Sequence, residues 1–418
     1  MAISHLYPDE RPALSLNFAR SKVIDSRVSI TRATTATFLG GNGLIQTAAA
    51  GEGRIDHDGG TGECLGLLIE ESRTNLIKNS VINSSNWNTG TGATLTNNTS
   101  ETTAPDGTST AAKYVGTGGM GSWVALYDTG DAISLTNNVQ YTYSLFAKPT
   151  HSDKTIFVLR GDIRDAGGID FSVDFDLSGD GSVDAEFGSP DSSSIEKYPN
   201  GWYRVIVTAT STASTTEEPG FSEKTSGDGT KGFYVWGYQV EQGAFVTSHI
   251  PTSGSTVTRN ADVAKISGTD FSDFFNSSEG TFVARLPAKT PAEGFIADVG
   301  NNSTSGSAAS GYILKYVASS NNASGDSRVN DGSTALVEVS VTGSNVDLVF
   351  AYEENNFNTA VNGTLGTADT SGAVPTLGAQ QVFLGSRFNS QAIVNTPISS
   401  FVYYNTRLTD TQIQALSR

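Results

Sequence analysis

The sequence has almost no cysteine. Cys64 is the single cysteine among 418 residues, so no intrachain disulfide can form. The fold must therefore be held by packing and hydrogen bonds. A protein that assembles in the cytoplasm and later meets the outside world fits this composition as well as a cytosolic protein does.

Positive charge is also scarce. The chain carries 26 lysines and arginines against 43 aspartates and glutamates, which gives a formal net charge of -17 and a pI near 4.6. No basic cluster is present that could neutralise phosphates and release counterions. We therefore expect neither nucleic-acid binding nor attraction to an anionic membrane, and the net charge favours solubility.

Long hydrophobic runs are missing as well. No apolar stretch reaches the length of a membrane-spanning helix, so membrane insertion is not expected. The first residues, MAISHLYPDERPAL, carry a charge by the ninth position and contain no apolar core segment, so a secretory signal peptide is not expected either.

The sequence is rich in glycine and in short segments in which apolar and polar residues alternate. It contains 45 glycines, only 17% charged residues and few long helical patterns. Short strands joined by tight turns have this composition. The predicted class is all-β, with an N-terminal attachment segment followed by two antiparallel β-sandwich (jelly-roll) domains. At 418 residues the chain is longer than one hydrophobic core usually needs.

Three units are predicted, over residues 1–80, 81–262 and 263–418. The first has alternating stretches at Leu14–Phe18 and Val28–Thr31 but few large apolar residues. Such a segment is unlikely to close a core alone, so we expect it to pack on the next domain, on sister chains or on another protein. This is the behaviour of an adaptor.

Strands recur between turn clusters in the middle unit. They are predicted at 123–127, 140–147, 155–160, 170–175, 202–208 and 232–240. This spacing is typical of a β-sandwich. In the last unit, an alternating strand over 397–405 is followed by a short helix that we expect Thr409 to cap.

Catalytic patterns are weak. The four histidines, His5, His57, His151 and His249, lie far apart and outside protease or triad motifs, so surface or loop positions are expected. Glu70 and Glu71 are neighbours, and neighbours on a strand point to opposite faces, so they cannot flank one glycosidic bond. Pairing with Arg54 or Arg73 is the favoured interpretation. We expect no enzyme activity.

One acidic stretch superficially resembles a calcium loop. Asp174, Asp176, Asp180 and Asp184 lie in VDFDLSGDGSVDAEF, but no glutamate follows at the EF-hand spacing. A hairpin with a Gly-Asp-Gly turn is the favoured interpretation. Metal ligands are left unassigned.

Aromatic residues give the better candidates for binding. Tyr234, Trp236 and Tyr238 alternate, so on a regular strand they share one face at the spacing of adjacent sugar rings. The same face can equally be the second half of a core, and both interpretations stay open. Trp123 carries the same ambiguity. Loops around Tyr352 and Arg387 are the next candidates for carbohydrate binding.

Family resemblance supplies the context. FLGGNGLI at 38–45 together with RIDHDGGTGECLGLLIEESRTNLIKNS at 54–80 resembles a segment of tailed-phage virion proteins, which are tail fibres and similar appendages. Segments at 141–148, 201–205 and 235–243 resemble jelly-roll carbohydrate-binding modules. The end of the chain is similar to concanavalin-like or laminin-G-like lectin sandwiches, and it lacks the Glu-x-Asp-x-Glu motif of the hydrolytic members.

These resemblances imply a virion structural protein, a tail fibre or host-adsorption appendage that recognises host surface glycans non-covalently. Its partners would be other virion proteins, bound through the N-terminal segment, and copies of itself in a homotrimer. It would be assembled in the host cytoplasm and exposed on the particle. No cofactor is implied except a structural calcium, which jelly-roll modules often hold. The alternatives are a capsid-decorating, head-fibre or baseplate protein and, less favoured, a polysaccharide depolymerase.

Overall fold

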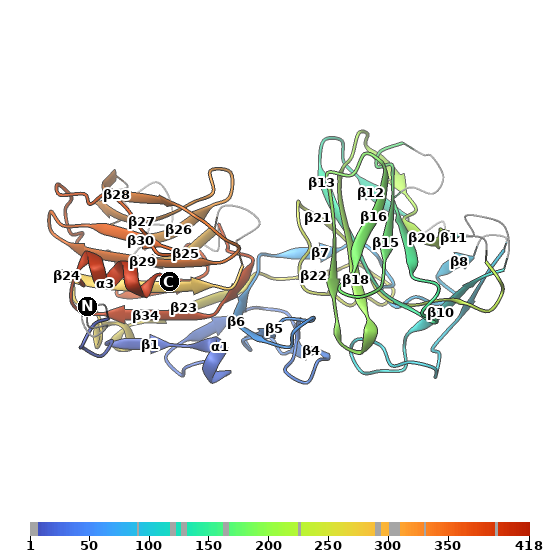
Figure 1. Cartoon of the computed structure of the whole chain (residues 1–418), viewed down its shortest axis with the longest axis horizontal. Helices are drawn as coiled ribbons and strands as arrows, with labels where there is room; N and C mark the ends of the chain where they lie inside the picture. Colours follow the sequence, from blue (N-terminus) through green and yellow to red (C-terminus); the bar gives the residue numbers. More distant parts are fainter. Residues whose placement is uncertain are drawn as a thin grey trace.

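The computed structural model describes residues 7–89, 92–117, 123–126, 132–161, 167–224, 227–288, 294–300, 310–329, 332–388 and 392–418, with the backbone alone at 123–126 and 332. The described chain is built almost wholly of antiparallel strands in two lobes (Figure 1). The predicted all-β class with two β-sandwiches is confirmed. No helix within the described residues is long and apolar enough to cross a membrane.

One lobe, the inserted sandwich, contains strands β8 to β21 of residues 87–242. Its first sheet runs in the order β17 (Ser192–Lys197), β18 (Tyr203–Thr210), β13 (Gln140–Pro149), β21 (Gly232–Gln242), β10 (Ala112–Gly116) and β9 (Ala93–Thr96). Its second sheet runs in the order β16 (Ser182–Gly188), β15 (Phe171–Asp176), β14 (Ile156–Arg160), β20 (Gly220–Glu223), β11 (Trp123–Leu126) and β8 (Trp87–Thr89). A small ribbon of β12 (Ile133–Leu135) and β19 (Thr215–Glu217) lies at one end. The two main sheets enclose a core of alternating apolar side chains, as the strand spacing predicts.

The other lobe, the composite sandwich, contains β1, β2, β23 to β32 and β34. Its first sheet runs in the order β1 (Leu14–Leu16), β34 (Ser400–Tyr404), β24 (Glu279–Leu286), β29 (Val346–Glu353), β30 (Asn358–Val361) and β31 (Thr364–Leu365). Its second sheet runs in the order β2 (Ser29–Thr31), β23 (Val263–Ser267), β32 (Gln381–Leu384), β25 (Gly294–Val299), β26 (Gly311–Val317), β27 (Asn322–Val329) and β28 (Gly332–Ser340). Helices α1 (Phe18–Ser21), α2 (Thr269–Ser272) and α3 (Asp410–Leu416) belong to this lobe. Thr409 caps α3 as predicted, in a reciprocal capping box with Gln412.

The N-terminal segment is part of the composite sandwich. Strand β1 pairs with β34, and β2 pairs with β23, so each forms an edge of one of the two sheets. Leu14, Leu16 and Phe18 are buried in the same core as the C-terminal strands. The predicted boundaries at 80 and 262 therefore separate strands that share one core. The few large apolar residues of the segment suffice because they complete an existing core and do not have to form their own.

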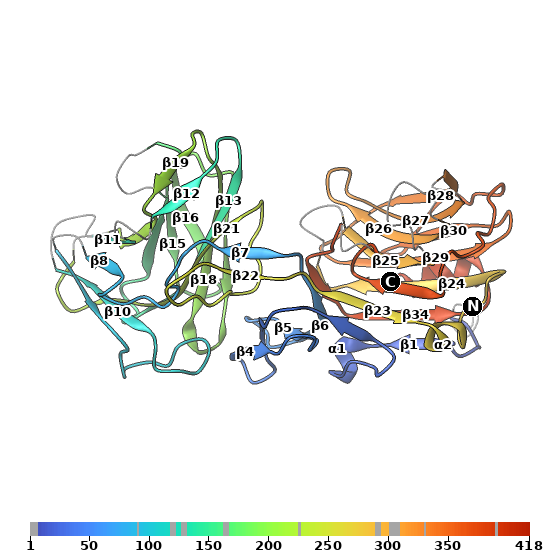
Figure 2. The ribbon, with the colours of Figure 1, turned by 180° about the vertical axis from the view of Figure 1, so that it is seen from behind.

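The inserted sandwich is joined to the composite sandwich by two chain crossings. Strand β7 (Arg73–Asn75) leads out and β22 (Val257–Arg259) leads back, and the two pair as a short antiparallel ribbon. Figures 1 and 2 show this ribbon at the waist, while β1 and α3, near the two ends of the chain, lie together in the other lobe. The middle domain is thus an insertion into a domain made of two distant chain segments.

A three-stranded sheet and a separate hairpin, mostly from the N-terminal segment, lie at the waist between the two lobes. Strand β6 (Cys64–Ile69) pairs with both β5 (Ile55–His57) and β33 (Thr396–Ile398). The hairpin of β3 (Ala36–Leu39) and β4 (Ile45–Ala48) reaches the inserted sandwich. Its Ile45 packs in a cluster with Trp202 and Trp236, and its amide donates to the Pro105 carbonyl at 2.9 Å.

Candidate binding cleft at the joint

A buried ion-pair network ties the two chain crossings to the N-terminal segment. Arg54 donates from Nη1 to Glu70 Oε2 at 2.7 Å and from Nη2 to Asp262 Oδ2. Arg32 donates to the other oxygen of Asp262, Oδ1, at 2.7 Å. Glu70 lies just before the outgoing crossing, and Asp262 lies just after the returning one. Because all four side chains are shielded from water, the network fixes where the two crossings meet.

Backbone and linker groups complete this network. The amide of Glu70 donates to Asp262 Oδ2 at 2.9 Å, and the amide of Asp262 donates to the Glu70 carbonyl at 2.9 Å. The amide of Ser248 donates to Glu70 Oε1 at 2.7 Å. Burial alone would raise the pKa of Glu70, but the guanidinium groups of Arg259 and Arg54 hold it at about 2. Glu70 is therefore ionised at neutral pH.

The predicted pairing of the two adjacent glutamates is confirmed. Glu70 pairs with Arg54, as described, and Glu71 pairs with Arg73 at 2.7 Å. Both glutamates thus serve the joint, Glu70 as a buried partner and Glu71 as a partly exposed one.

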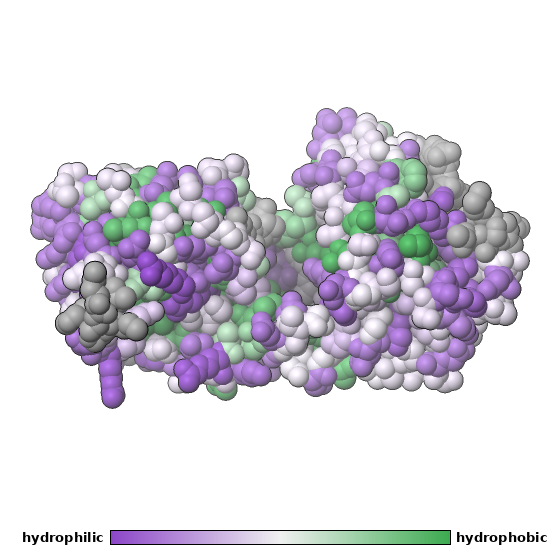
Figure 3. Space-filling view, viewed as in Figure 1, coloured by the Kyte–Doolittle hydropathy of each residue, from purple (hydrophilic) through white to green (hydrophobic). Residues whose placement is uncertain are grey.

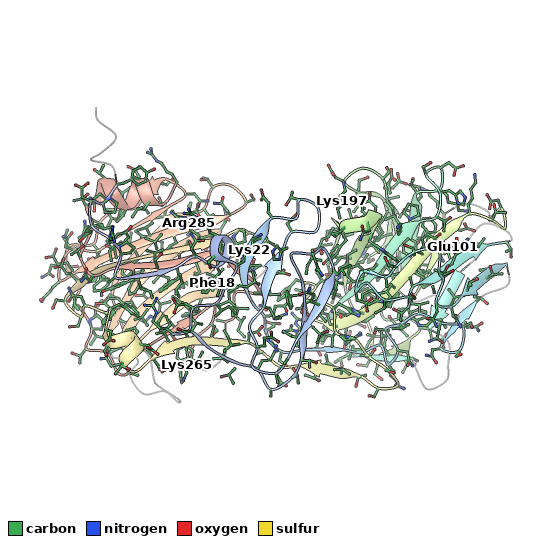
Figure 4. All side chains as sticks on the ribbon, turned by 90° about the horizontal axis from the view of Figure 1, so that it is seen from below. Phe18, Lys22, Glu101, Lys197, Lys265 and Arg285 are labelled. Atoms are coloured by element: carbon green, nitrogen blue, oxygen red, sulfur yellow. The ribbon has the colours of Figure 1, made fainter. Side chains whose placement is uncertain are left out.

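A cleft with a volume of about 180 Å³ lies over this network, between the two lobes. The N-terminal segment contributes β3, Asp56 of β5 and the end of β6. The inserted sandwich contributes Phe146, Glu196, Tyr198 and Arg204, and the remaining walls are the 246–249 loop and the 395–397 segment. Figure 3 shows the waist between the two lobes where these parts meet, and Figure 4 marks Lys197 at the end of the inserted sandwich that adjoins the N-terminal strands.

Strand register places three of the cleft residues side by side. Arg204 on β18 is the cross-strand partner of Phe146 on β13 and of Glu196 on β17. Its guanidinium carbon lies 5.3 Å from the Phe146 ring centroid, and Nη2 donates to Ser144 Oγ at 3.0 Å. Packed against an aromatic ring and beside a carboxylate, this guanidinium forms a fixed polar floor.

Asp56 is the titratable group of most interest on the opposite wall. Its Oδ1 accepts the Leu39 amide at 2.8 Å, and the side chain is partly buried. Burial among protein atoms raises the pKa of Asp56 to about 7, against the effect of the Leu39 amide. The group thus changes charge near neutral pH inside the cleft, which is a property often found at functional sites.

His249 closes the inner end of the cleft. Its ring lies 4.7 Å from the Trp236 ring and 6.1 Å from the Phe146 ring, measured between centroids. Burial, with a smaller contribution from the Arg204 charge, lowers the pKa of His249 to about 3, so the imidazole is neutral. His57 is also buried, with Nδ1 3.0 Å from the Leu39 carbonyl. The expectation of surface or loop positions is therefore wrong for His57, which is buried at the end of β5, whereas His249 lies in a loop as expected but is buried there.

Several cleft residues remain reachable by a ligand. Phe38, Tyr198 and Asn395 are partly exposed, and Glu196 is exposed. The Tyr198 ring meets Phe146 edge-on at 5.0 Å, which fixes its orientation. The cleft thus combines flat apolar surface with carboxylate and amide groups that can hydrogen-bond. It can bind a small, hydroxyl-rich molecule.

The strand predicted to carry sugar-stacking rings carries buried rings. Tyr234 and Trp236 are 7% and 4% exposed, covered by Ala104, Ala111 and Ile45. Trp236 donates from Nε1 to Thr110 Oγ1 at 2.9 Å. Of the two interpretations left open, core packing is the one that the structure shows for this face.

The expectation that the three rings share one face is wrong. Gly237 adopts φ +67°, and the pairing of β13 with β21 shifts register between Ser144 and Phe146. This bulge turns Tyr238 to the opposite face, where it is fully buried and its ring lies 5.0 Å from that of Trp87. An extra residue in one strand breaks the alternation on which the prediction rested.

The other predicted carbohydrate-binding residues are not brought together. Tyr352 is fully buried, with its hydroxyl 2.8 Å from that of Tyr403, so it has no ring face to offer a sugar. Arg387 is partly exposed and its guanidinium carbon lies 5.2 Å from the Phe295 ring centroid. Trp123 lies in β11, but its side chain is outside the described residues. The role of Arg387 and Trp123 in binding stays a prediction.

The acidic stretch at 174–184 forms the predicted hairpin of β15 and β16. Lys224 Nζ lies 3.0 Å from Asp174 Oδ2 and 2.5 Å from Asp184 Oδ2, so a lysine holds these two carboxylates. Across the described chain, no group of three or more His, Cys, Asp or Glu side chains is placed to hold a metal ion. Structural calcium stays a prediction.

Sequence reasoning missed the cleft. Asp56, Glu196, Tyr198 and Arg204 are distant in sequence, and each has an ordinary local pattern. The one available signal was that Asp56 falls within the turn-rich stretch singled out as a joint. The pairing of Glu196 with Arg204 depends on the register of β17 on β18, which no local pattern reveals.

Comparison with known proteins gives distant structural likenesses alone. No family model matches the chain, and no curated protein matches it. Among solved structures, the CBM40 of Ruminococcus gnavus IT-sialidase bound to α2,3-sialyllactose is 18% identical over 34% of this chain and 84% of that one, with a TM-score of 0.29. Trypanosoma rangeli sialidase in complex with the inhibitor DANA is 10% identical over 78% of this chain and 53% of that one, with a TM-score of 0.27. A receptor binding domain is 12% identical over 38% and 39%, with a TM-score of 0.28. At these scores the assignment of two β-sandwiches rests on the strand pairing of the chain itself.

Proposed function

We propose that this protein is a phage virion appendage, of the tail-fibre or host-adsorption kind, that binds a host surface glycan non-covalently in the cleft at its joint. The observation that carries the proposal is the cleft itself. Tyr198 and Phe38 offer partly exposed rings, while Asp56, Glu196 and Asn395 offer hydrogen-bonding groups. A sugar has an apolar ring face and several hydroxyl groups, so it needs both kinds of surface at once.

The rigidity of the cleft supports the same proposal. Glu70, which lines the cleft, is held by Arg54 in the buried network, and Arg204 is held by Phe146 and Ser144. Side chains that are already ordered lose little entropy when a ligand binds. Each site would still be weak, and several copies on one particle would make adsorption effective.

The virion role comes from the segment at 38–45 and 54–80, which resembles tailed-phage appendage proteins. Since β1 and β2 belong to the composite sandwich, attachment to other virion proteins would use the outer surface of that lobe and would not use a separate arm. A homotrimer exposed on the particle, after assembly in the host cytoplasm, is part of this proposal. Placement as a capsid-decorating, head-fibre or baseplate protein would use the same domains.

Glycan-array binding of the full chain tests the proposal. Asp56→Asn removes the charge and keeps an oxygen that can accept the Leu39 amide, and Tyr198→Leu removes the ring. We expect Asp56→Asn to weaken binding by about tenfold, as for hydrogen bonds to charged groups, and Tyr198→Leu by about fivefold. The matched control is Asp153→Asn, an exposed carboxylate that pairs with Lys231 away from the cleft.

Neither cleft variant may melt below the wild type, so that lost binding is not lost folding. If the wild-type chain binds array glycans and the cleft variants bind as tightly as Asp153→Asn does, the site is elsewhere. If no surface glycan of any host binds, the glycan part of the proposal is wrong.

A second candidate function, glycan cleavage, is favoured by one observation. The pKa of Asp56 is raised to about 7, which suits a general acid, and Glu196 lines the same cleft. Our proposal is that no cleavage occurs, because this pKa has an ordinary cause in burial. Incubation with host polysaccharide and measurement of new reducing ends decides between the two. Reducing ends that appear with the wild type and vanish with Asp56→Asn would establish the enzyme.

A further inference from the structure

A second pocket, rich in asparagine, lies on the inserted sandwich. Its lining includes Asn79, Asn83, Asn86, Asn97, Asn98 and Val81, together with small hydroxyl side chains, and no charged side chain lines it. It shares no residue with the cleft at the joint. Three chain segments form it: the stretch before β8, the turn after β9 and the start of the returning linker.

The frame of this pocket is fixed by hydrogen bonds. Asn79 Oδ1 accepts the Gly254 amide at 2.9 Å, and Asn83 Oδ1 accepts the Ser85 amide at 2.9 Å. Asn97 exchanges two bonds with Ser84, from its Nδ2 to Oγ at 2.9 Å and from the Ser84 amide to its Oδ1 at 2.8 Å. These bonds tie the turn after β9 to the stretch before β8.

A buried tryptophan supports the same frame from behind. Trp87 is 1% exposed and donates from its indole nitrogen to the Asn79 carbonyl at 3.4 Å. The backbone amides of Asn86 and Trp87 both donate to the Asn83 carbonyl, at 3.1 Å and 2.9 Å. The pocket is therefore built on the core of the sandwich and not on a loose loop.

Some amide groups in the pocket have no protein partner. Within the part of the chain that the structure describes, the side-chain amides of Asn86 and Asn98 make no hydrogen bond, and neither does Nδ2 of Asn83. Asn98 has φ +49°, so its left-handed backbone explains an asparagine there without any ligand. The Asn86 side chain has no such local reason.

The geometry points to a binding site for a neutral, hydroxyl-rich ligand, namely an uncharged sugar residue. A carboxamide carries two donors and an acceptor on one plane, and a sugar hydroxyl can both donate and accept. Several fixed amides can therefore pair with several hydroxyls, while Val81 offers an apolar surface to the sugar ring. Without a lysine or arginine in the lining, an acidic sugar gains no charge-assisted bond.

This site would bind a sugar in addition to the cleft, and its binding does not depend on the cleft. If both bind, one chain offers two glycan contacts, and binding to a repeating surface polysaccharide gains from the link between them. Either site can fail without the other, because their lining residues are separate.

Saturation-transfer NMR on the full chain tests the inference. The probes are the methyl glycosides of glucose, galactose, mannose and N-acetylglucosamine, with sialyllactose as the acidic probe. Asn86→Ala removes an unpaired amide. Asn98→Gly removes the other and keeps the left-handed backbone, which glycine adopts freely. The matched control is Asn138→Gly, because Asn138 is exposed with φ +59° in a turn outside the pocket.

We expect at least one neutral glycoside to give a signal with the wild type and with Asn138→Gly. Its affinity should fall about threefold or more in Asn86→Ala and in Asn98→Gly, the loss expected for one hydrogen bond. Absence of any neutral-sugar signal would overturn the inference. So would a signal that the two pocket variants leave unchanged. A signal lost in Asp56→Asn but kept in Asn86→Ala and Asn98→Gly would support the cleft and overturn the pocket.

Discussion

The two sandwiches are alike in architecture and differ in how the chain builds them. The strands of the inserted sandwich follow one another without interruption from β8 to β21. The composite sandwich draws β1 and β2 from the first 31 residues and all its other strands from residues beyond 262. The first can form from local order along the chain, whereas the second needs contacts between residues more than 230 positions apart, such as Ser29 with Lys265.

Because the inserted sandwich interrupts the composite one, the chain crosses the waist twice, and a buried ion-pair network lies where the crossings meet. The insertion leaves and returns through β7 and β22, and the buried charges of Arg54, Glu70 and Asp262 join the two crossings. The proposed glycan cleft lies over this network. The joint is therefore both the element that closes the composite sandwich and the base of the proposed site.

Removal of the N-terminal strands should have the largest effect, and it should affect the two lobes differently. A chain without residues 1–60 loses one edge strand from each sheet of the composite sandwich, and also Arg32 and Arg54. We expect that lobe to unfold or aggregate while the inserted sandwich stays folded, because the buried core between its two sheets begins at Ile77 and only Ile45 is lost from the smaller cluster around Trp202 and Trp236. Calorimetry and limited proteolysis should show the loss of one unfolding transition.

The control for this deletion is a chain without residues 1–9, which keeps β1 and every core residue. It should retain both transitions. If the chain without residues 1–60 also retained both unfolding transitions, the N-terminal segment would not be needed for the composite sandwich. The assignment of β1 and β2 to that domain would then be wrong.

Loss of a single buried charge should have the next largest effect. Arg54→Met leaves Glu70 and Asp262 without their shared partner, and breaking a buried ion pair typically costs about 3 to 5 kcal/mol. Chemical unfolding measures this cost. The matched control is Arg27→Met, since the pair of Arg27 with Asp25 is about one-third exposed and should contribute about 1 kcal/mol or less. Equal losses in the two variants would contradict the role given to the joint.

Trp236→Ala separates core packing from sugar stacking in the inserted sandwich. Because the ring is buried, we expect a loss of about 3 to 5 kcal/mol of stability. The transition of the inserted sandwich should move to lower temperature and that of the composite sandwich should not. Normal stability together with lost glycan binding would instead restore Trp236 as a stacking residue.

A pH effect on stability should be the smallest of these changes. The pKa of Asp56 is raised in the folded chain to about 7 from its usual 3.8. Between these values the folded state binds more protons than the unfolded state does, so this group lowers stability as pH rises from about 4 to 7. Asp56→Asn should therefore melt above the wild type at pH 8 and near it at pH 4. A variant that melts lower at pH 8 would show that the carboxylate stabilises the fold.

Local patterns were sufficient for much of the fold. Strand positions in the inserted sandwich and the Thr409 cap depend on residues within a few positions of one another, and they are found as predicted. A local rule, the alternation of neighbouring side chains, spoke against Glu70 and Glu71 as a catalytic pair, and the favoured pairing of both with arginines is found.

Long-range contacts could not be predicted in this way. The partner of β1 lies almost 390 residues away, so the shortage of apolar residues near the N-terminus could not reveal that this segment supplies two edge strands. At Gly237 a single bulge reversed the face of Tyr238. The cleft depends on four parts of the chain that meet only in the folded protein: the N-terminal segment, the inserted sandwich, the 246–249 loop and the 395–397 segment.

Hydrogen exchange of the full chain tests the central claim most directly. If the N-terminal segment and the C-terminal strands form one domain, the amides of β1 and β2 should exchange as slowly as those of β34 and β23, their partners, and should lose protection together with them in denaturant. The inserted sandwich should lose protection in a separate step. Fast exchange in β1 and β2 while β34 and β23 stay protected would contradict the account.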